Sequence, residues 1–596
     1  MRPVTLTRVM HCRASRETVW KRIADTLRLN RYVGNSALDV KERETDDTYR
    51  FELRCRIAGF RVSYLEHPYE FVEGELMAFH RVMLDGPART ITTRYELADA
   101  PATGGCDVTV GIDVMPRAWL LRPFMWLATA RTLAALERYV SGADGAGSET
   151  VISCAVAERA VDAARSRVGA DHPRELIDRL VAHLRSADDL ELAPIRPFAL
   201  ATAWSVDRNA LLRLCLAAVP AGLLDLRWGV LCPSCRTHSQ VLPSLRDLDR
   251  QAHCHACDLR FDTELDRAVE ALFLPHPSVR RVETRPFCIA GPALTPHVVA
   301  QVALEKGARG TLGTPAEPCR VRLFVRGGAT ALVDVVDGGS ETATVAIHAQ
   351  SVSPAHVSVR PRGKIELSNE SGAGRHAKIE RTEFLFNAAT AHHVTTMAEF
   401  RRLFGAEALR PGLALRISHV AILFSDLCGS TALYSRIGDA AAFGVVTDCF
   451  RYGTSIVQRH GGTVVKTMGD AVMAAFTSSA AAVAAGAEML ERWPELVENQ
   501  PAARALDLKI GINAGPCTIV TANGGIDYFG QTVNGAARLL HLAGEREAVL
   551  AEGLVEALPP GAQVVERRLV RVKGIDEPIP VARVRVAVPG ARVASV

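Results

Sequence analysis

The sequence predicts a multidomain α+β protein, and three observations support this prediction. A chain of 596 residues is too long for one hydrophobic core, so several domains are expected. Near the N-terminus, apolar and polar residues alternate with period two before a long segment with one apolar face, which predicts antiparallel strands and then a helix. In the last third of the chain, runs typical of buried strands are mixed with helical segments.

The composition is that of ordinary globular protein. Hydrophobic residues make up 48% of the chain, charged residues 23%, and the formal net charge is +4. No segment is basic enough for extensive phosphate contacts, so a nucleic-acid partner is not expected. No apolar run reaches the roughly 18 residues of a membrane span, and no secretory signal is visible. We therefore expect a cytoplasmic protein whose 14 cysteines are reduced thiols or metal ligands.

Residues 1–142 are expected to form the first domain. A helix is predicted around Val19–Leu27, strands follow it, and a long helix from about Trp119 to Val140 ends the unit. This order of elements, with the Val19-Trp20 pair in the first helix, resembles the START-like, polyketide-cyclase/dehydrase helix-grip family. The resemblance implies a cavity for an apolar small-molecule ligand. Three aromatic residues could line this cavity or simply belong to the core: Trp119, Phe124 and Trp126.

Residues 151–275 are expected to be a helical region that carries a metal site, after a glycine-rich linker at 141–150. Helices are predicted as far as about residue 230, among them Arg208–Ala218 with Asp207 as its N-cap.

Residues 276–400 contain short β-type runs broken by Gly, Ser and Asn turns, so a β-rich domain is expected there. The sequence does not identify its role. A predicted helix at Met397–Phe404 leads into the last domain, residues 411–590.

Two CxxC pairs form the most specific local motif of the middle region. They are Cys232-Pro-Ser-Cys235 and Cys254-His-Ala-Cys257, with 18 residues between them. Each pair can present two thiolates, and the spacer lets both pairs meet around one tetrahedral Zn²⁺. Because all four ligand positions are filled, the predicted zinc is structural, with His253 and His255 as reserve ligands. Such a ribbon can bind a nucleic acid or a protein, but the absence of a basic aromatic stripe favours the structural role.

Two aspartates in the last third of the chain lie where strands end. Asp426 ends a buried-strand run and precedes the turn Leu427-Cys-Gly-Ser-Thr431. Asp470 follows the bend, at Gly469, of a β-hairpin predicted over residues 462–476. Two aspartates at adjacent strand ends can bind a pair of divalent ions, whereas either one alone could be a helix N-cap or an ordinary turn residue.

A third motif is Asp527-Tyr-Phe-Gly-Gln-Thr-Val-Asn534-Gly-Ala-Ala-Arg538. Asn534 and Arg538 are four residues apart, so on a helix they share one face, which by itself could be a solvated surface. The three motifs in this order, followed by Val572–Pro578, resemble the catalytic domain of class III adenylyl/guanylyl cyclases over residues 417–586.

The resemblance implies a ferredoxin-like α/β catalytic domain and a role for each motif residue. The groups implied to bind two Mg²⁺ or Mn²⁺ ions are Asp426, Asp470 and the backbone carbonyl of Leu427. The residues implied to bind the nucleotide or assist catalysis are Lys466, Asp527, Gly429, Thr431, Asn534 and Arg538, and Lys573 could touch the triphosphate. In the family, the metal-binding and nucleotide-reading residues of one site come from two protomers, so a homodimer is expected.

The nucleotide base is predicted from donors and acceptors. Adenine offers an N6 amino donor and an N1 acceptor, which suit an accepting Asp527 and a donating Lys466. Guanine reverses this pattern, and guanylyl cyclases that resemble this domain carry Glu and Cys or Ser at these positions. The chain has only eight lysines, so a lysine at position 466 is informative. The predicted substrate is ATP.

The function expected from the sequence is therefore an adenylate cyclase that makes 3′,5′-cyclic AMP and pyrophosphate, regulated by its N-terminal domains. Two alternatives stay open. One is a guanylate cyclase. The other is a zinc-containing regulatory or binding protein whose cyclase-like domain only senses nucleotides.

Overall fold

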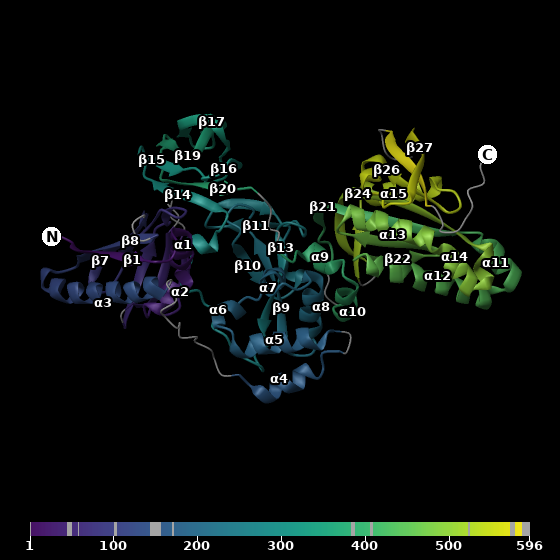
Figure 1. Cartoon of the computed structure of the whole chain (residues 1–596), viewed down its shortest axis with the longest axis horizontal. Coiled ribbons are helices and arrows are strands. Elements are labelled where there is room, and N and C mark those ends of the chain that lie inside the picture. The colour runs from purple at the N-terminus through teal and green to yellow at the C-terminus, as the bar shows by residue number, and fades with distance from the viewer. Residues whose placement is uncertain are drawn as a thin grey trace.

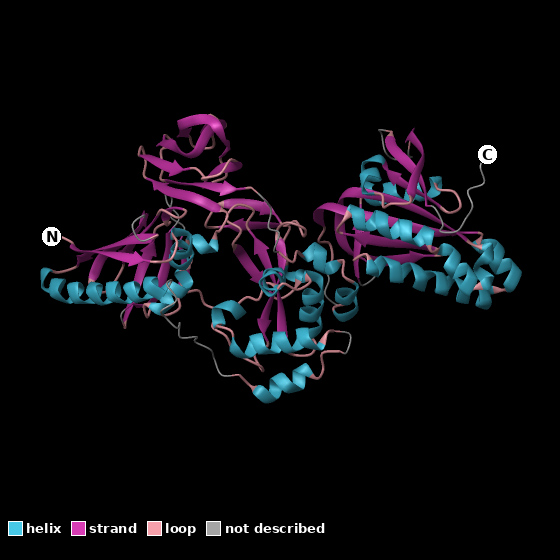
Figure 2. Ribbon diagram, in the orientation of Figure 1, coloured by secondary structure: helices cyan, strands magenta, loops and turns pink. Residues whose placement is uncertain are grey.

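The structure is a computed structural model that describes residues 2–43, 50–57, 59–100, 104–142, 156–169, 172–382, 388–405, 409–522, 525–571 and 578–586. The chain is a multidomain α+β protein, as predicted. The N-terminal and C-terminal domains lie at opposite ends of the molecule, with the helical and β-rich regions between them (Figures 1 and 2). From residue 143 onward, the predicted linker lies outside the described residues.

The N-terminal domain is an antiparallel sheet against which one long helix packs. Its strands are β1 (Val4–Cys12), β2 (Asp39–Arg43), β3 (Arg50–Ile57), β4 (Phe60–Glu66), β5 (Glu70–Val72), β6 (Leu76–Met83), β7 (Ala88–Ala100) and β8 (Gly105–Pro116). Its helices are α1 (Arg16–Ala24), α2 (Thr26–Tyr32) and α3 (Arg122–Ser141), with a short turn η1 (Trp119–Leu121) before α3. The single helix predicted around Val19–Leu27 is two helices, because the Asp25 side chain accepts the Arg28 N–H at 3.1 Å and starts a new one.

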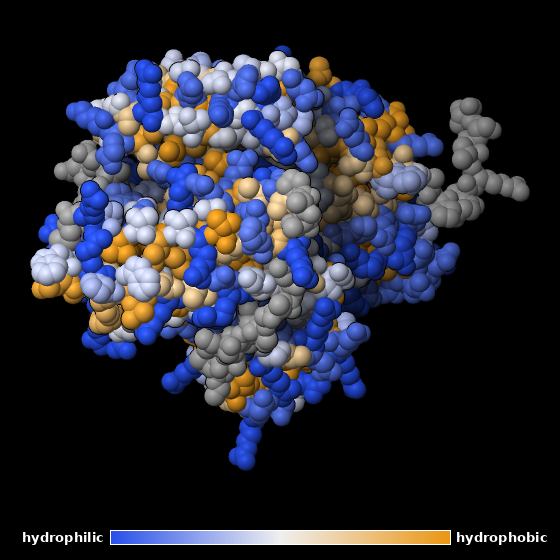
Figure 3. All heavy atoms as spheres, turned by 60° about the vertical axis from the view of Figure 1, so that its left-hand side comes forward, coloured by the Kyte–Doolittle hydropathy of each residue, from blue (hydrophilic) through white to orange (hydrophobic). Residues whose placement is uncertain are grey.

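A cavity of about 160 Å³ lies between this sheet and α3. Met125, Thr129 and Leu136 of α3 line it, and Phe124 belongs to its wall while remaining 40% exposed. The prediction that Trp119 and Trp126 could line the cavity is wrong. Their residues are 69% and 54% exposed, because they lie on the solvent-facing side of η1 and α3. Figure 3 turns this domain toward the viewer and shows apolar atoms scattered over its surface.

The middle region contains five described helices and a three-stranded sheet. The helices are α4 (Glu158–Arg165), α5 (Arg174–Ser186), α6 (Asp189–Leu192), α7 (Pro197–Trp204) and α8 (Arg208–Ala218). Asp207 caps α8 as predicted, since its Oδ1 accepts the Ala210 N–H at 2.7 Å. The prediction of helix as far as residue 230 is wrong at its end. Gly222 adopts a φ of +81° after α8, and the next apolar run is strand β9 (Leu224–Leu231).

β9 lies between β10 (His238–Leu242) and β13 (Val269–Pro275). The two cysteine pairs are on the loop after β9 and on the two-stranded ribbon of β11 (Gln251–Cys254) and β12 (Leu259–Asp262). Along the chain, the ribbon is thus inserted between β10 and β13, which belong to the same sheet.

The β-rich region predicted from residue 276 onward is present. Its strands are β14 (Val298–Leu304), β15 (Arg309–Gly313), β16 (Cys319–Val325), β17 (Thr330–Ile347), β18 (Val352–Ser353), β19 (His356–Asn369) and β20 (Arg375–Arg381). β14 also pairs with β5 through Ala300–Val72 and Gln301–Phe71. The first domain and the β-rich region therefore share one continuous sheet, although they are far apart in sequence (Figure 2).

The C-terminal domain is a mixed sheet in the order β22-β23-β21-β24-β26-β28-β27, with β25 paired to β24. Its strands are β21 (Leu415–Cys428), β22 (Thr463–Met468), β23 (Ala471–Phe476), β24 (Asp507–Ala522), β25 (Gly525–Phe529), β26 (Glu547–Ala551), β27 (Ala562–Val570) and β28 (Ile579–Val586). Its helices are α11 (Ser430–Ile437), α12 (Asp439–Arg459), α13 (Ser479–Glu491), α14 (Trp493–Asn499) and α15 (Gln531–Leu542). The hairpin predicted over residues 462–476 is confirmed as β22 and β23.

The two faces of this sheet are covered by different parts of the chain. Apolar side chains of α12 and α13 share a core with Ala421 and Leu423 of β21. Ile422 and Phe424, which point to the other face, share a core with α15, with the middle region and with two connecting helices. These are α9 (Ala391–Thr395) and α10 (Ala398–Leu403). None of the helices in the described ranges is long and apolar enough to span a bilayer.

Candidate active site and metal centre

The two predicted metal-binding aspartates lie at the same end of the C-terminal sheet. β21 pairs with β23 up to Ser425 and Val472, so Asp426 follows directly beside the turn that carries Asp470. Asp426 is paired with Lys509 of β24, whose Nζ lies 2.8 Å from Oδ2. The pKa of Lys509 is raised because its ammonium donates to Asp426, and the negative charge of Asp470 contributes to the same shift. Both carboxylates therefore act on one lysine.

Lys509 is a site residue that sequence reasoning missed. It lies directly opposite Asp426 in the β21–β24 ladder. The one signal in the sequence is the rarity of lysine, since Lys509 is one of only eight in the chain. The pairing register needed to place Lys509 beside Asp426 is not visible in a local motif.

The turn after Asp426 needs its glycine. Gly429 has a φ of +85°, and a Cβ on it would lie 2.6 Å from the carbonyl oxygen of Ala505. Only glycine therefore fits both the conformation and the space. Leu427 is buried within β21, and α11 begins at Ser430 directly after Gly429, with Thr431 exposed in its first turn.

The predicted base-reading residues are in direct contact. Lys466 on β22 and Asp527 on β25 are 61 positions apart, and Nζ of Lys466 lies 2.7 Å from Oδ2 of Asp527. The other carboxylate oxygen accepts the Tyr528 N–H at 2.8 Å. The Asp527 side chain is only 7% exposed, whereas that of Lys466 is 32% exposed and lies 5.5 Å from the centre of the Phe529 ring. Asp527 is thus a buried acceptor held in place by hydrogen bonds, and Lys466 beside it is a donor that a ligand can reach.

Asn534 and Arg538 lie together on the outer face of α15. The helix packs closely on β24, where a Cβ on Gly511 would lie 2.3 Å from the Leu540 nitrogen, so this position must be glycine. The residues between Asn534 and Arg538 that face the sheet are buried, while these two side chains are exposed. Among the described residues, neither side chain is hydrogen-bonded or ion-paired to the other predicted site residues. The structure therefore brings two pairs together and leaves this third pair facing outward.

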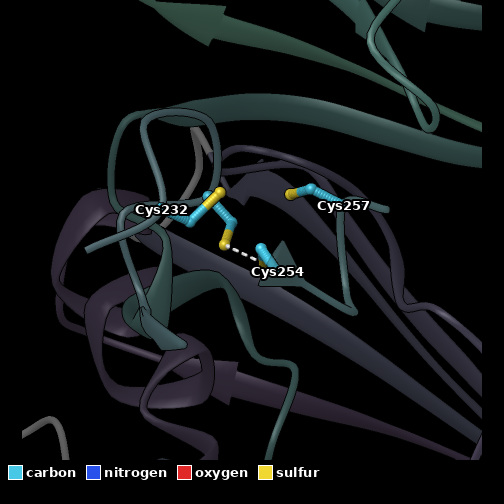
Figure 4. Close-up of side chains that lie close together, drawn as sticks. Cys232, Cys254 and Cys257 are labelled. Carbon is cyan, nitrogen blue, oxygen red and sulfur yellow. Dashed lines mark hydrogen bonds between the residues drawn. The ribbon is translucent and has the colours of Figure 1, made fainter. Parts of the chain in front are cut away.

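The four cysteines of the two CxxC pairs converge on one point, and Figure 4 shows Cys232, Cys254 and Cys257 close together. All four are buried, and their sulfur atoms lie within 4.8 Å of one another. The Sγ atoms of Cys235 and Cys254 are 3.6 Å apart. Zinc–sulfur bonds of about 2.3 Å in a tetrahedron place the sulfurs about 3.8 Å apart, so the arrangement fits one metal ion of this kind.

The histidines named as reserve ligands are engaged elsewhere. His253 Nε2 lies 3.2 Å from Asp258 Oδ1, and its ring is 4.5 Å from that of His255. Neither histidine belongs to the group of four ligands that the described residues bring together.

The cysteine cluster is bound to the β-rich region by charged and polar contacts. Lys378 of β20 is buried with its Nζ 3.5 Å from Cys257 Sγ. The Ser234 hydroxyl donates to Glu380 at 3.2 Å, and Arg236 donates to the Arg381 carbonyl at 2.9 Å. A tetrathiolate that holds Zn²⁺ carries net negative charge, which the Lys378 ammonium offsets. The cysteine cluster therefore lies where the ribbon meets β20.

Comparison with known protein families gives two matches. Residues 414–581 match the family described as the adenylate and guanylate cyclase catalytic domain. This part of the chain is a class III cyclase catalytic domain. The matched residues include Asp426, Asp470, the Lys466–Asp527 pair and the outer α15 residues Asn534 and Arg538. Residues 161–287, including the cysteine cluster, match a family of unknown function (DUF5939).

Similarity to individual proteins is concentrated in about a quarter of the chain. An uncharacterized protein of Mycobacterium tuberculosis is 32% identical over 156 residues, which are 26% of this chain and 38% of that protein. Adenylate cyclase 2 of Rhizobium meliloti is 31% identical over 157 residues, 23% of this chain and 41% of that protein. The chain thus spans about two fifths of the length of these relatives.

Solved structures similar to the chain include cyclases of both specificities. The adenylyl cyclase CyaB from P. aeruginosa is 24% identical and covers 30% of this chain and 100% of its own, with a TM-score of 0.27. The guanylyl cyclase Cya2 is 25% identical and covers 29% of this chain and 95% of its own, also with a TM-score of 0.27. Residues 572–577 of the last predicted motif, with Lys573, lie outside the described residues.

Proposed function

We propose that the chain is an adenylate cyclase that converts ATP to 3′,5′-cyclic AMP and pyrophosphate. The observation that carries the proposal is the Lys466–Asp527 pair inside a cyclase domain. An incoming adenine can replace this contact with two others, because its N1 accepts from Lys466 and its N6 amino group donates to Asp527. Guanine presents an oxygen where Asp527 needs a donor, so two acceptors would face each other. The pair therefore favours ATP.

The carboxylates of Asp426 and Asp470 suit two Mg²⁺ or Mn²⁺ ions, because hard divalent cations prefer oxygen ligands. Such ions, when bound, lower the pKa of the ribose 3′-hydroxyl and offset the charge of the triphosphate. Lys509 holds Asp426 in place and neutralises it. Its side chain is 21% exposed, so a phosphate oxygen that approaches Asp426 can also reach its ammonium.

Arg538 is suited to the negative charge that develops on the α-phosphate, because a guanidinium is permanently charged and donates two parallel hydrogen bonds. Asn534 on the same face of α15 can hold the ribose. Because both side chains face outward, a second protomer can supply them to the Asp426 end of its partner. A two-fold homodimer gives two equivalent sites by this exchange.

The direct test is cyclic AMP formation by the full chain from ATP with Mg²⁺ or Mn²⁺. Asp426→Ala and Arg538→Ala should each lower kcat by at least about 10²-fold, the usual loss for a preorganised charged group. Arg451→Ala is a matched control, because Arg451 is 73% exposed on α12 of the same domain. Cyclic GMP as the main product would make the protein a guanylate cyclase. Nucleotide binding without turnover in a dimeric protein would favour the nucleotide-sensor alternative.

We infer further that the four cysteines hold one structural Zn²⁺. The donor set, the sulfur distances and the buried Lys378 beside Cys257 support this inference. With four protein ligands the ion has no open position for a substrate.

We also infer that the N-terminal cavity binds an apolar small molecule and alters cyclase output. Its walls are mainly aliphatic and aromatic, and Arg81, the one charged residue among the described lining residues, is paired with the buried Glu66. Such a cavity favours an apolar ligand of low charge. Deletion of residues 1–142 would remove β5 and so expose the edge of β14, which could disturb the β-rich region. A substitution that fills the cavity with a larger side chain is therefore the sharper test. Thr129→Phe should abolish the binding of an apolar fluorescent probe, whereas Trp126→Phe on the outer face should not.

A further inference from the structure

The connecting helices α9 and α10 lie against the base-reading end of the cyclase domain. His392 of α9 is buried with its ring 6.4 Å from that of Tyr528, which follows Asp527. Phe400 of α10 is buried and packs edge-on against Trp228 of the middle region, with ring centres 6.0 Å apart. These helices thus join the core of the middle region to the strand that carries Asp527.

One side chain of α10 binds both base-reading strands. Arg401 donates through Nη2 to the carbonyl of Ile526 at 2.9 Å and through Nη1 to the carbonyl of Val465 at 3.4 Å. Ile526 immediately precedes Asp527, and Val465 immediately precedes Lys466. Nε of the same guanidinium lies 3.4 Å from the carbonyl of Thr395 at the end of α9. The guanidinium of Arg401 therefore links the connecting helices α9 and α10 to the backbone next to both Asp527 and Lys466.

The backbone at these positions leaves carbonyls for Arg401 to bind. The β22–β23 ladder shifts register between Val464 and Lys466, so Val465 is an extra residue in a bulge. β25 pairs only with β24 among the described strands, so one of its edges is free of ladder bonds. Bulged and edge carbonyls need other donors when they are buried, and the guanidinium fork supplies two.

The sheet itself does not fix the distance between Lys466 and Asp527. β22 is at one end of the strand order and β25 is attached through β24, with β23 and β21 in between. Without a base, the Lys466–Asp527 ion pair links the two strands directly. That link is lost when a base binds to both side chains, whereas the Arg401 link can persist.

From this geometry we propose that Arg401 is a positioning residue, which holds β22 and β25 at the spacing that adenine requires. The proposal rests on the proposed cyclase function. Arg401 touches neither the metal-binding aspartates nor the α15 pair, so its effect should be on nucleotide affinity and base choice. Because it belongs to α10, it also gives the N-terminal regions a physical connection to base recognition.

The test uses the full chain with Arg401→Met, which keeps the length and apolar stem but removes the donors. With ATP, KM should rise about 10-fold, the loss expected for one or two hydrogen bonds to a charged group, while kcat stays within about 3-fold. The ratio of kcat/KM for ATP over GTP should fall by a similar factor. Arg401→Lys keeps the charge but not the planar fork, so its KM should lie between those of wild type and Arg401→Met. Arg402→Met is the control, because Arg402 is the exposed neighbour on the same helix.

The result that overturns the proposal is a KM and an ATP/GTP ratio for Arg401→Met equal to those of Arg402→Met. A fall in kcat at unchanged KM would also overturn it. If Arg401→Met does not fold, Arg401→Lys decides by the same two quantities. Dissociation constants for ATP and GTP are measured on the same proteins. If wild type binds nucleotides without turnover, the proposed cyclase activity fails, while these constants still decide whether Arg401 sets base choice.

Discussion

Base choice can be tested by exchanging the Lys466–Asp527 pair in single and double variants. The change is Lys466→Glu, Asp527→Cys, and both together, which is the pattern of guanylyl cyclases that resemble this domain. In the structure the two charges lie 2.7 Å apart, and Asp527 is almost fully buried. Each single variant therefore leaves one charge without its partner, and Lys466→Glu also places a second carboxylate beside Asp527.

The size of the effect follows from this burial. Breaking a buried ion pair costs about 3–5 kcal/mol, and the low end applies because a third of the Lys466 side chain is exposed. Two charge-assisted hydrogen bonds to the base are each worth about 1.5–3 kcal/mol. Either single change should lower kcat/KM for ATP by at least about 10²-fold. The double variant removes the repulsion, so its melting temperature should lie above that of Lys466→Glu.

The assay measures kcat/KM for ATP and for GTP, together with the melting temperature, for wild type and the three variants. The double variant should prefer GTP, and the two changes should be strongly non-additive, as expected for residues in contact. Wild type that used both nucleotides equally would refute the donor–acceptor reasoning. So would an Asp527→Cys variant whose kcat/KM for ATP stayed within about twofold of wild type, because a buried acceptor would then have no role in binding.

Three further predictions follow from other parts of the structure. Asp426→Ala and Arg538→Ala are each expected to be inactive alone. When the two variants are mixed and pair at random, about a quarter of wild-type activity should return, because half the dimers then contain one of each and have one intact site. A mixture as inactive as its components would contradict sites shared between protomers. Zinc analysis should find one Zn²⁺ per chain, and Cys254→Ser should lose it and lower the melting temperature, since ligand loss removes binding energy that stabilises the fold; full stability without zinc would contradict the structural role. Burial lowers the pKa of His392 to about 4, and the charge of His393 adds to this shift while Asp266 opposes it. The unfolded imidazole has a pKa of about 6.5, so it binds more protons than the folded one between pH 6.5 and 4, and up to about 3 kcal/mol of stability should be lost as pH falls through that range. His392→Phe should therefore reduce the fall in melting temperature with decreasing pH below 6.5. A melting temperature that falls as steeply as in wild type would contradict this.

The parts of the site that the residues predict without the family resemblance are those whose geometry is local, whereas the pairing of Lys466 with Asp527, 61 positions apart, is implied only by the resemblance. The β22–β23 hairpin follows from Gly469 and its flanking apolar runs, and the shared face of Asn534 and Arg538 follows from their spacing. The cysteine cluster follows from ligand type and spacing, and the structure brings its four sulfurs together. In each case the residues concerned either lie within one element or belong to a motif with a fixed geometry.

The parts that sequence missed depend on register and on helix phase. Lys509 and Arg401 reach the site across strands and between domains, and no local pattern marks such partners. The sequence predicts that Trp119 and Trp126 line the cavity or belong to the core, but the turn and helix that carry them direct both toward solvent. β9 was taken for helix because a short, wholly apolar run has no periodicity that separates a buried strand from a helix.

The two ends of the cyclase site are supported in different ways, and this difference limits where the N-terminal regions can act. The Asp426 end is built from β21, β23 and β24, all of which belong to the cyclase domain and are joined by ladder hydrogen bonds. The Lys466–Asp527 end depends on α9, α10 and Arg401, which lie outside the matched residues 414–581. The middle region reaches β25 and β22 through the buried Phe400–Trp228 contact and Arg401, and it also contacts β21 directly, where the Ser418 N–H donates to Asp266. Because closely packed cores transmit strain, we expect an N-terminal signal that acts through Arg401 to change KM more than kcat, whereas one that acts through β21 would change kcat.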